Sequence, residues 1–536
     1  MSCAPCSRSV PDLTQLGEHS DCESFGIGLR RVPSRIRYVT ARLFHIATKR
    51  PFDGMRRQGR IARWVAASFA LASALALAPG EVQAGGLRGG CDHHRHAISY
   101  RVGKGMVRRP RVPALVPCLR VINNRTSESA TVAVLRSGRV LYAPLVENSY
   151  PAPLDDRGPA VIAASDDRFV HWHTIVPGDT NHILDVPPWM SVDPQTQRIW
   201  FASVLPGLCG AEISWSDDGG HIWQTNPAVG CPAMGSERIL EGPAPRGGAK
   251  PVGYRHVVYY CANVSDLSTS TLPCYRTLDG GHSFTFTGSF PDPPPKPGCD
   301  AKHPARPGAV GAEGYLYFPV YRCGELSIAL SRDEGATWEW VHVATSNVQD
   351  LYTTSVATDP AGNIYLAWIA GASKGPPSSN AILGKGRPVL SISRNHGRSW
   401  SRPVVVGPPQ VKDAEFVAIT ARRVGQLAIS YLANTNGSPL LNGWLSVTNE
   451  ALKPHALWSA ASLNDPHTPL IDATDQTMFG DRLFFTTDAF GAKGEPWAAF
   501  HCAKTSACPG RRIGVVGWLS APRTRRRPQH GGQGED

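Results

Sequence analysis

Ser331-Arg332-Asp333-Glu334-Gly335-Ala336-Thr337-Trp338 is one of four stretches of this chain that share a single spacing of residue types. The other three are Ser216-Asp217-Asp218-Gly219-Gly220-His221-Ile222-Trp223, Thr277-Leu278-Asp279-Gly280-Gly281-His282-Ser283-Phe284 and Ser393-Arg394-Asn395-His396-Gly397-Arg398-Ser399-Trp400. Each has Ser or Thr first, Asp or Asn third, Gly fifth and an aromatic residue eighth. The copies begin 61, 54 and 62 residues apart. Repetition at such a spacing indicates one structural unit used several times.

The residue types of the repeat are those of a tight hairpin turn. Asp or Asn accepts backbone N–H bonds in the turn that it starts, and Gly supplies a position with positive φ. Alternating apolar segments such as 211–215 and 326–330 precede the copies and have the pattern of strands. We therefore predict that each copy joins two strands. Two less complete copies stand at 165–172, which lacks the Gly, and at 448–450.

The composition agrees with an all-β protein. The chain has 536 residues, of which 42% are apolar and 18% charged, with 53 Gly and 46 Pro. This many Gly and Pro residues indicates many turns and argues against a helical bundle.

The repeat is similar to the Asp-box (BNR) repeat, and residues 119–520 resemble the sialidase-like β-propeller superfamily. The resemblance implies a β-propeller of four-stranded blades, with a structural turn at Asp218, Asp279, Asp333 and Asn395 that lies away from the substrate face. Dividing about 400 residues by a repeat of about 57 gives seven blades, whereas sialidases have six, and both numbers stay open. Leu119-Arg120-Val121-Ile122 is a candidate strand to close the ring from the N-terminal side.

The N-terminus has the pattern of an export signal. Four Arg residues within 56–63 precede the apolar run 64–77, and small residues at the end of Val82-Gln83-Ala84 suit a cleavage site. We predict a secretory signal peptide at 55–84, a leader extension or non-biological segment at 1–54, an N-terminal tail at 85–118 and a disordered basic tail at 521–536. No membrane span then remains after cleavage. The alternative is an N-terminal anchor with a cytoplasmic arm.

The cysteines fit an oxidising compartment, because the ten beyond residue 84 can form local pairs. The simplest pairing is Cys91–Cys118, Cys209–Cys231, Cys261–Cys274, Cys299–Cys323 and Cys502–Cys508. We therefore predict a secreted or periplasmic protein.

Charge and motifs exclude several classes of function. The formal net charge is +12, but residues 1–84 hold twelve basic and six acidic residues and so carry half of it. No basic stripe that would follow a phosphate backbone was found, so we predict no nucleic-acid partner. The histidines of 93–96 are interpreted as a solvated tail, and neither a metal site nor a cofactor is predicted. The sequence does not indicate an oligomeric state.

The resemblance implies a particular catalytic site. In sialidases three Arg residues bind the sugar carboxylate, a Tyr activated by Glu is the nucleophile, and a loop Asp is the acid. The candidates here are Asp155 and Asp156 as acid, Tyr321 and Glu325 as nucleophile and activator, and Arg125 and Arg322 for substrate binding. The alternatives are a solvated turn at 155–156 and a disulfide-pinned loop at 321–325. The Arg-Ile-Pro motif of active family members does not occur.

Two classes of function follow from these observations. The first is an exported glycoside hydrolase of the exo-α-sialidase type. The second is a non-catalytic extracellular propeller that binds a glycan or a protein. Both predict a glycan or glycoconjugate, or a surface protein, as the partner.

Overall fold

The computed structural model describes residues that all belong to one compact unit, Glu81–Asp536. They are residues 87, 89–107, 114–146, 160–167, 171–178, 189–204, 211–230, 238–262, 264–265, 270–290, 308–322, 324–346, 354–371, 385–472, 487–503, 505–508 and 513–521. The predictions for 1–54, for the signal peptide at 55–84 and for the tail beyond residue 521 lie outside this part of the chain. Within it, every regular element is a β-strand, and there is no helix with the length and hydropathy needed to cross a bilayer.

The strands form six sheets, each named here by its innermost strand. The β8 sheet holds β8 (Trp189–Val192), β9 (Ile199–Val204), β10 (Ala211–Ser216) and β11 (Gln224–Val229). The β17 sheet holds β17 (Ala309–Val310), β18 (Leu316–Arg322), β19 (Glu325–Ser331) and β20 (Glu339–Thr345). The β21 sheet holds β21 (Thr354–Thr358), β22 (Ile364–Ala370), β23 (Arg387–Ser393) and β24 (Val404–Val405).

Three sheets carry additional strands. The β12 sheet holds β12 (Arg238–Gly242), β13 (Val257–Cys261), β15 (Ser270–Thr277), β16 (Thr285–Phe290) and the short β14 (Val264–Ser265). The β25 sheet holds β25 (Asp413–Ala421), β26 (Leu427–Asn434), β27 (Leu440–Thr448), β28 (Leu457–Ser462), β2 (Ile98–Arg101), β3 (Gly105–Met106) and β29 (Ile471–Asp472). The β4 sheet holds β30 (Thr487–Phe490), β31 (Pro496–Cys502), β32 (Ile513–Ser520), β4 (Val116–Val134), β5 (Val140–Val146), β6 (Val161–Ser165), β7 (His173–Ile175) and β1 (Gly90–Cys91).

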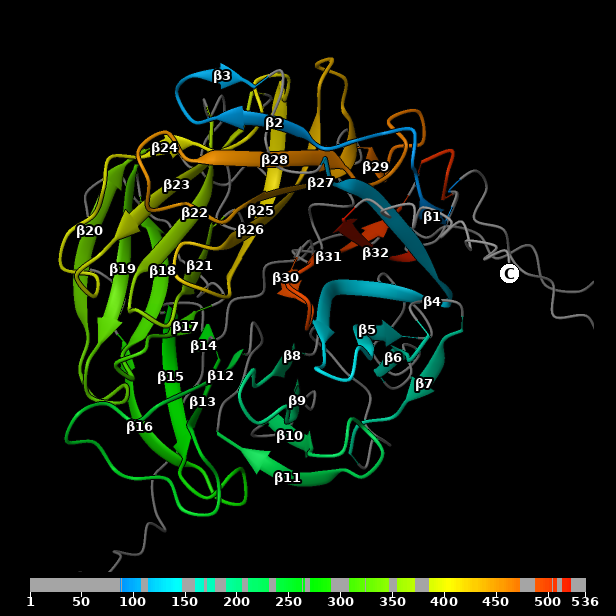
Figure 1. The fold of residues 1–536 in the computed structure, drawn as a ribbon. Helices are drawn as coiled ribbons and strands as arrows, with labels where there is room; N and C mark the ends of the chain where they lie inside the picture. The colour runs from blue at the N-terminus through cyan, green and yellow to red at the C-terminus, as the bar shows by residue number, and fades with distance from the viewer. Residues whose placement is uncertain are drawn as a thin grey trace, which may run out of the picture. The chain divides into compact units, whose positions relative to one another are not determined.

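The six sheets are arranged as a β-propeller, as the sequence predicts (Figure 1). The eight-stranded β4 sheet fills two neighbouring sectors, because Val116–Thr126 pairs with β32 and Thr126–Val134 pairs with β5. The innermost strands β4, β8, β12, β17, β21, β25 and β30 each contact the next and close a ring. Both blade numbers left open by the sequence describe this one ring. Counting continuous hydrogen-bonded sheets gives six, and counting innermost strands gives seven four-stranded sets, because the β4 sheet contains two sets.

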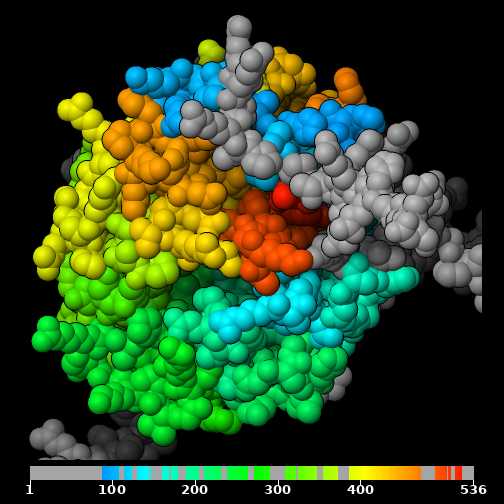
Figure 2. Space-filling model, in the orientation of Figure 1, coloured from blue at the N-terminus to red at the C-terminus, as the bar shows by residue number. Residues whose placement is uncertain are grey.

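The ring closes through the N-terminal strand. Leu119 pairs with Gly517 and Ile122 with Gly514, so β4 completes a set whose other strands come from the C-terminal end. The predicted closing strand is confirmed. In the space-filling view, the red-orange segments of β30 and β31 lie between the orange segments of the β25 sheet and the cyan β4 and β5 (Figure 2).

The segment predicted to be an N-terminal tail takes part in the fold. Cys91 of β1 pairs with Cys118 of β4, and β2 extends the β25 sheet by pairing with β28. Arg95, between the two strands, donates to the carbonyl oxygen of Asn464 at 2.8 Å. The segment therefore bridges the β4 and β25 sheets.

The four repeat copies form the same turn between the third and fourth strands of a set. In the copy at 331–338, Asp333 Oδ1 accepts hydrogen bonds from the Ser331 hydroxyl (2.9 Å) and the Thr337 N–H (2.8 Å). Asn395 makes the same two bonds through its amide oxygen, with Ser393 and Ser399. The residue before each repeat Gly also has positive φ, and in two copies this residue is a second Gly.

These turns share one end of the strands with the hairpins that join first to second strands. Arg139 donates to the carbonyl oxygen of Gly219, and Arg198 donates to that of Gly280 at 2.6 Å. Farther round the ring, Arg394 donates to the carbonyl oxygen of Leu452. We call this end of the propeller the turn face.

Three of the five predicted disulfides are present: Cys91–Cys118, Cys261–Cys274 and Cys502–Cys508. The predicted pairs Cys209–Cys231 and Cys299–Cys323 lie outside the described residues.

Candidate functional site

The described structure does not bring the predicted pair Tyr321 and Glu325 together on one face of their sheet. Tyr321 stands opposite Leu326, and Arg322 stands opposite Glu325, at the end of the β18–β19 hairpin. Because successive residues of a strand point to opposite faces, the Tyr321 and Glu325 side chains lie on opposite sides of the sheet. Arg125 belongs to β4, far from this hairpin in the sequence. Asp155 and Asp156 lie outside the described residues.

Both side chains of the predicted catalytic pair have local partners. The Tyr321 hydroxyl accepts a hydrogen bond from the Gly324 N–H at 3.1 Å, within the tight hairpin. Glu325 accepts one from the Thr345 hydroxyl at 3.2 Å, and His342 Nδ1 lies 3.1 Å from its carboxylate. Neither contact activates a nucleophile, since the carboxylate is on the wrong face to take the Tyr proton. The assignment of these residues to catalysis stays a prediction.

A cleft opens between the β25 and β4 sheets on the turn face. Its volume is about 1070 Å³. The β25 sheet supplies the start of β26 and the turn from β27 to β28, and the β4 sheet supplies the β30–β31 turn and the end of β32. Cys91 and His93 of the N-terminal segment line it as well. The cleft adjoins the incomplete repeat copy at 448–450.

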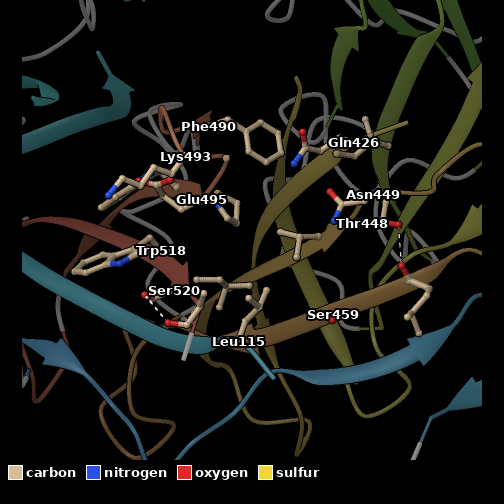
Figure 3. Close-up of a pocket in the computed structure, with 18 of the residues that line it drawn as sticks. Leu115, Gln426, Thr448, Asn449, Ser459, Phe490, Lys493, Glu495, Trp518 and Ser520 are labelled. Atoms are coloured by element: carbon tan, nitrogen blue, oxygen red, sulfur yellow. Dashed lines mark hydrogen bonds between the residues drawn. The ribbon is translucent and has the colours of Figure 1, made fainter. Parts of the chain in front are cut away.

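Aromatic side chains form part of the wall on the side of the β4 sheet. Trp518 is half-buried and stacks on the buried Trp497, with ring centroids 4.7 Å apart and planes inclined by 23°. Phe490, also half-buried, lies farther along the same cleft (Figure 3). Stacking fixes the orientation of Trp518, so the cleft has a preformed flat apolar surface.

Two polar side chains of the cleft have buried oxygen atoms without a hydrogen bond. Gln426 Oε1 and Glu495 Oε2 are inaccessible to solvent, and no described residue donates to either. Gln426 comes from the start of the β25 sheet's second strand, and Glu495 from the β30–β31 turn, so they face the cleft from its two sides (Figure 3). A buried acceptor that loses water and gains no partner costs about 1–3 kcal/mol. Rotation of either side chain toward the cleft would expose its oxygen to donors on a bound molecule, which would recover this energy.

Glu450, the second carboxylate of the cleft, is already occupied. It accepts hydrogen bonds from Lys453 Nζ and the Leu457 N–H, each at 2.9 Å, and Arg101 lies 3.4 Å away. The hydrogen bond from Lys453 is the largest of the causes that hold the pKa of Glu450 below its ordinary value. This carboxylate therefore fixes the turn and is unsuited to act as a general acid.

A second polar cluster lies between the β8 and β12 sheets. Asp193 is fully buried and accepts hydrogen bonds from the Tyr254 hydroxyl (2.6 Å), and His256 Nδ1 lies 2.7 Å from the same oxygen. Burial by itself would raise the pKa of Asp193, but these contacts outweigh it and hold the pKa well below the ordinary value. Asp193 also accepts from the Gln195 N–H. The cluster is closed upon itself and serves the packing of the two sheets.

Sequence reasoning missed every residue of the cleft. They come from separate parts of the chain, and their types are ordinary for strands and turns, so only the incomplete repeat copy at 448–450 gave a signal. Among the described residues, no group of three or more His, Cys, Asp or Glu side chains is placed to hold a metal ion.

No family model and no curated protein sequence matches the chain. Among solved structures, the chain is similar to an intramolecular trans-sialidase from Ruminococcus gnavus, with 12% identity and a TM-score of 0.39, over 74% of this chain and 94% of that one. It is similar to virginiamycin B lyase from Staphylococcus aureus, with 10% identity and a TM-score of 0.40, over 75% and 98%. It is also similar to a PL25 ulvan lyase, with 11% identity and a TM-score of 0.43, over 74% of this chain and 93% of that one.

The sheets of this structure themselves confirm the β-propeller that the repeat predicts, and the solved structures add no argument about its family. Their identities and TM-scores are too low to transfer an activity or a site residue. The function has to be argued from the cleft itself.

Proposed function

We propose that this protein is an exported, sialidase-like propeller that binds glycans in the cleft between the β25 and β4 sheets. The observation that carries the proposal is the pair of buried, unpartnered oxygens, Gln426 Oε1 and Glu495 Oε2, beside an aromatic wall. Binding sites combine a concave, partly apolar surface with a few polar groups that fix the ligand's orientation.

The chemistry of a sugar suits this combination. A pyranose ring offers several hydroxyl donors at its edge and an apolar C–H face. The hydroxyls can donate to the amide oxygen of Gln426 and the carboxylate of Glu495, which recovers the cost of their burial. The C–H face can pack on the Trp518 ring, whose orientation is fixed by Trp497.

Binding is favoured over hydrolysis. A glycosidase needs one group that donates a proton to the leaving oxygen and a second group that acts as base or nucleophile at the same bond. In the cleft, Glu450 is held in its ionised form by its partners, which leaves Glu495 as the other carboxylate of the lining. At the β18–β19 hairpin, Tyr321 and Glu325 point to opposite faces.

An extracellular or periplasmic location belongs to the same proposal. Three disulfides are present in the described part of the chain, and such bonds persist in oxidising compartments. The export pattern at 55–84 supports this location from the sequence.

The test is a glycan array followed by calorimetry on the strongest oligosaccharide. Glu495→Gln removes the charge and Gln426→Leu removes the amide, and each is expected to weaken binding at least tenfold with little change in melting temperature. Glu325→Gln is the matched control, since Glu325 is a carboxylate outside the cleft, and it should bind as the wild type does. The proposal fails if the cleft variants bind normally. A parallel screen with fluorogenic glycosides, including a sialoside, measures any hydrolysis.

A further inference from the structure

The turn face is electrically uneven, and the repeat turns themselves show it. Three copies carry Asp at the third position, namely Asp218, Asp279 and Asp333, whereas the copy in the β21 sheet has Asn395. Asn395 accepts the same bonds, from the Ser393 hydroxyl at 3.0 Å and the Ser399 N–H at 2.9 Å. The incomplete copy in the β25 sheet has Glu450 at the third position, and Lys453 and Arg101 form ion pairs with this carboxylate. The copy in the β21 sheet therefore keeps the hydrogen bonds of the repeat turn without its negative charge.

The same part of the face carries an excess of basic side chains. We call it the basic sector: the turns of the β21 and β25 sheets, the β30–β31 turn and the β2–β3 hairpin. Six of its basic residues have no carboxylate within ion-pair distance among the described residues: Lys104, Arg394, Arg398, Arg422, Arg423 and Lys493. Two more, Arg101 and Lys453, share Glu450. Besides Glu450, the acidic residues of these turns are Glu495 and the buried Asp359, which accepts hydrogen bonds from Asn363 and Tyr365.

Basic residues elsewhere on the turn face are neutralised only in part, since three form ion pairs while four have no carboxylate within ion-pair distance among the described residues: Arg136, Arg246, Lys250 and Arg255. Arg139 forms an ion pair with Asp166 at 2.6 Å, and Arg198 forms one with Asp217 at 2.6 Å. Arg332 likewise pairs with Glu339. The turns outside the basic sector also carry the acidic repeat residues Asp218, Asp279 and Asp333, so the excess of positive charge is greatest in the basic sector.

The cleft lies within the basic sector. Its lining includes Arg120, Lys453 and Lys493. The turn between β25 and β26, which ends at Gln426 of the cleft, carries Arg422 and Arg423. Figure 3 shows Lys493 and Gln426 on different sides of the same space. A polymeric ligand that extends out of this cleft would meet the Arg and Lys side chains of the surrounding turns that have no ion pair among the described residues.

We infer that the ligand of the cleft is a polyanionic glycan, whose repeating units carry carboxylate or sulfate groups. This inference rests on the proposed function and names its ligand class. One sugar unit occupies the cleft against Trp518, and the following units extend over the basic sector. Several unpaired cations attract a repeating anion more than a single charge, because their potentials add.

Two other polyanions fit the contacts less well. A bilayer presents an extended surface, whereas the sector surrounds a concave cleft whose acceptors, Gln426 Oε1 and Glu495 Oε2, lie buried. The deoxyribose–phosphate backbone of DNA presents acceptor oxygens and has no free sugar hydroxyls to donate to Gln426 Oε1 and Glu495 Oε2. A charged polysaccharide supplies both the anions for the turns and the hydroxyl donors for the cleft.

The experiment measures binding of polygalacturonate, a polymer of uronic acid, and of the uncharged polysaccharide pullulan at several salt concentrations. We expect wild-type protein to bind polygalacturonate more tightly than pullulan, with an affinity that falls steadily as salt rises. The triple variant Arg398→Ser/Arg423→Ser/Lys493→Ser should lose at least tenfold in affinity and show a shallower salt dependence.

A matched triple variant on the same face is the control. Arg246→Ser/Lys250→Ser/Arg255→Ser removes the same charge from exposed residues of the β12–β13 connection, outside the basic sector. It should bind polygalacturonate as the wild type does. If the two triple variants lose equal affinity for polygalacturonate, the protein's net charge alone explains the effect, and the inference is overturned.

Two further arms separate this inference from the proposed function. If the cleft variants Glu495→Gln and Gln426→Leu abolish binding to a neutral array ligand while polygalacturonate does not bind, the glycan site stands and the polyanion inference fails. Tighter binding to phosphatidylglycerol vesicles or to duplex DNA than to polygalacturonate would also overturn it. Loss of polygalacturonate binding in the basic-sector triple variant alone supports it.

Discussion

The hydroxyl of Ser191 donates a hydrogen bond to Glu241 Oε1 at 2.8 Å, which joins innermost strands β8 and β12 across the boundary between two sheets. Removal from water, together with the negative charge of the nearby Asp193, raises the pKa of Glu241 to about 8. At neutral pH the carboxyl is therefore mostly protonated. Ionisation would place a second negative charge at this boundary.

This relationship predicts a stability that falls with rising pH. Because the folded-state pKa of Glu241 is above its ordinary value, the folded protein binds this proton more tightly than the unfolded chain does. The stabilisation is complete below the unfolded pKa, near 4.5, and is lost as pH rises through about 8. Glu241→Gln should match the wild type in melting temperature near pH 5 and exceed it at pH 9. Parallel curves for the two proteins between these values would contradict the account.

The repeat turns should contribute to stability and not to binding. Asp333→Ala removes the acceptor of the Ser331 hydroxyl and the Thr337 N–H, and losing such a turn bond costs about 0.5–2 kcal/mol. Denaturant unfolding should show this loss, while glycan affinity stays unchanged where the fold persists. Asp333→Asn should restore most of the stability, because Asn395 serves the same turn in the chain's own fourth copy. Reduced binding at full stability in Asp333→Ala would place the ligand at the repeat turns.

The asparagines of the basic sector offer a conservative test of its electrostatics. Asn395→Asp keeps the acceptor oxygen of the repeat turn, Asn449→Asp changes a residue that lines the cleft, and together they add two negative charges. We expect unchanged melting and a several-fold lower affinity for polygalacturonate at low salt, with the difference shrinking as salt screens the charges. A loss that persists in high salt would indicate a disturbed turn instead, and hydrogen exchange at 393–400 would detect it.

The disulfides should differ in their contribution to stability. Cys91–Cys118 closes a separation of 27 residues, whereas Cys502–Cys508 closes one of 6. Loop-closure entropy then gives about 3.5 kcal/mol for the first and about 2 kcal/mol for the second. Pairwise substitution by Ser, followed by denaturant unfolding, should reproduce this order. The reverse order would mean that strain or packing, and not chain entropy, decides their effect.

Much of the fold could be predicted from the sequence because each repeat turn is specified by residues that are neighbours in the sequence. Ser, Asp, Gly and Trp at fixed spacing specify a turn whose bonds are all internal, as at 331–338. The number of blades was harder, because β4 serves two neighbouring sets through one continuous strand. β1, β2 and β3 were missed, since strands of two to four residues exist only through pairing with β4 and β28.

The candidate site could not be predicted in the same way. Gln426, Glu495 and Trp518 meet only because the β25 and β4 sheets lie side by side. The predicted pair Tyr321 and Glu325 was chosen from residues close in sequence, and the alternation of the strands places the two side chains on opposite faces of the sheet. Turn chemistry is encoded locally, whereas the surface between two sheets is not.

The most direct measurement of the central claim is fluorine NMR of 5-fluorotryptophan-labelled protein, titrated with the best oligosaccharide from the array. The Trp518 resonance, assigned with Trp518→Phe, should shift or broaden on binding, because this ring forms the wall of the cleft. The resonances of Trp338 and Trp400, which belong to repeat turns outside the cleft, should stay in place. Saturating binding that leaves the Trp518 resonance unchanged would show that glycans bind elsewhere, and would contradict the account.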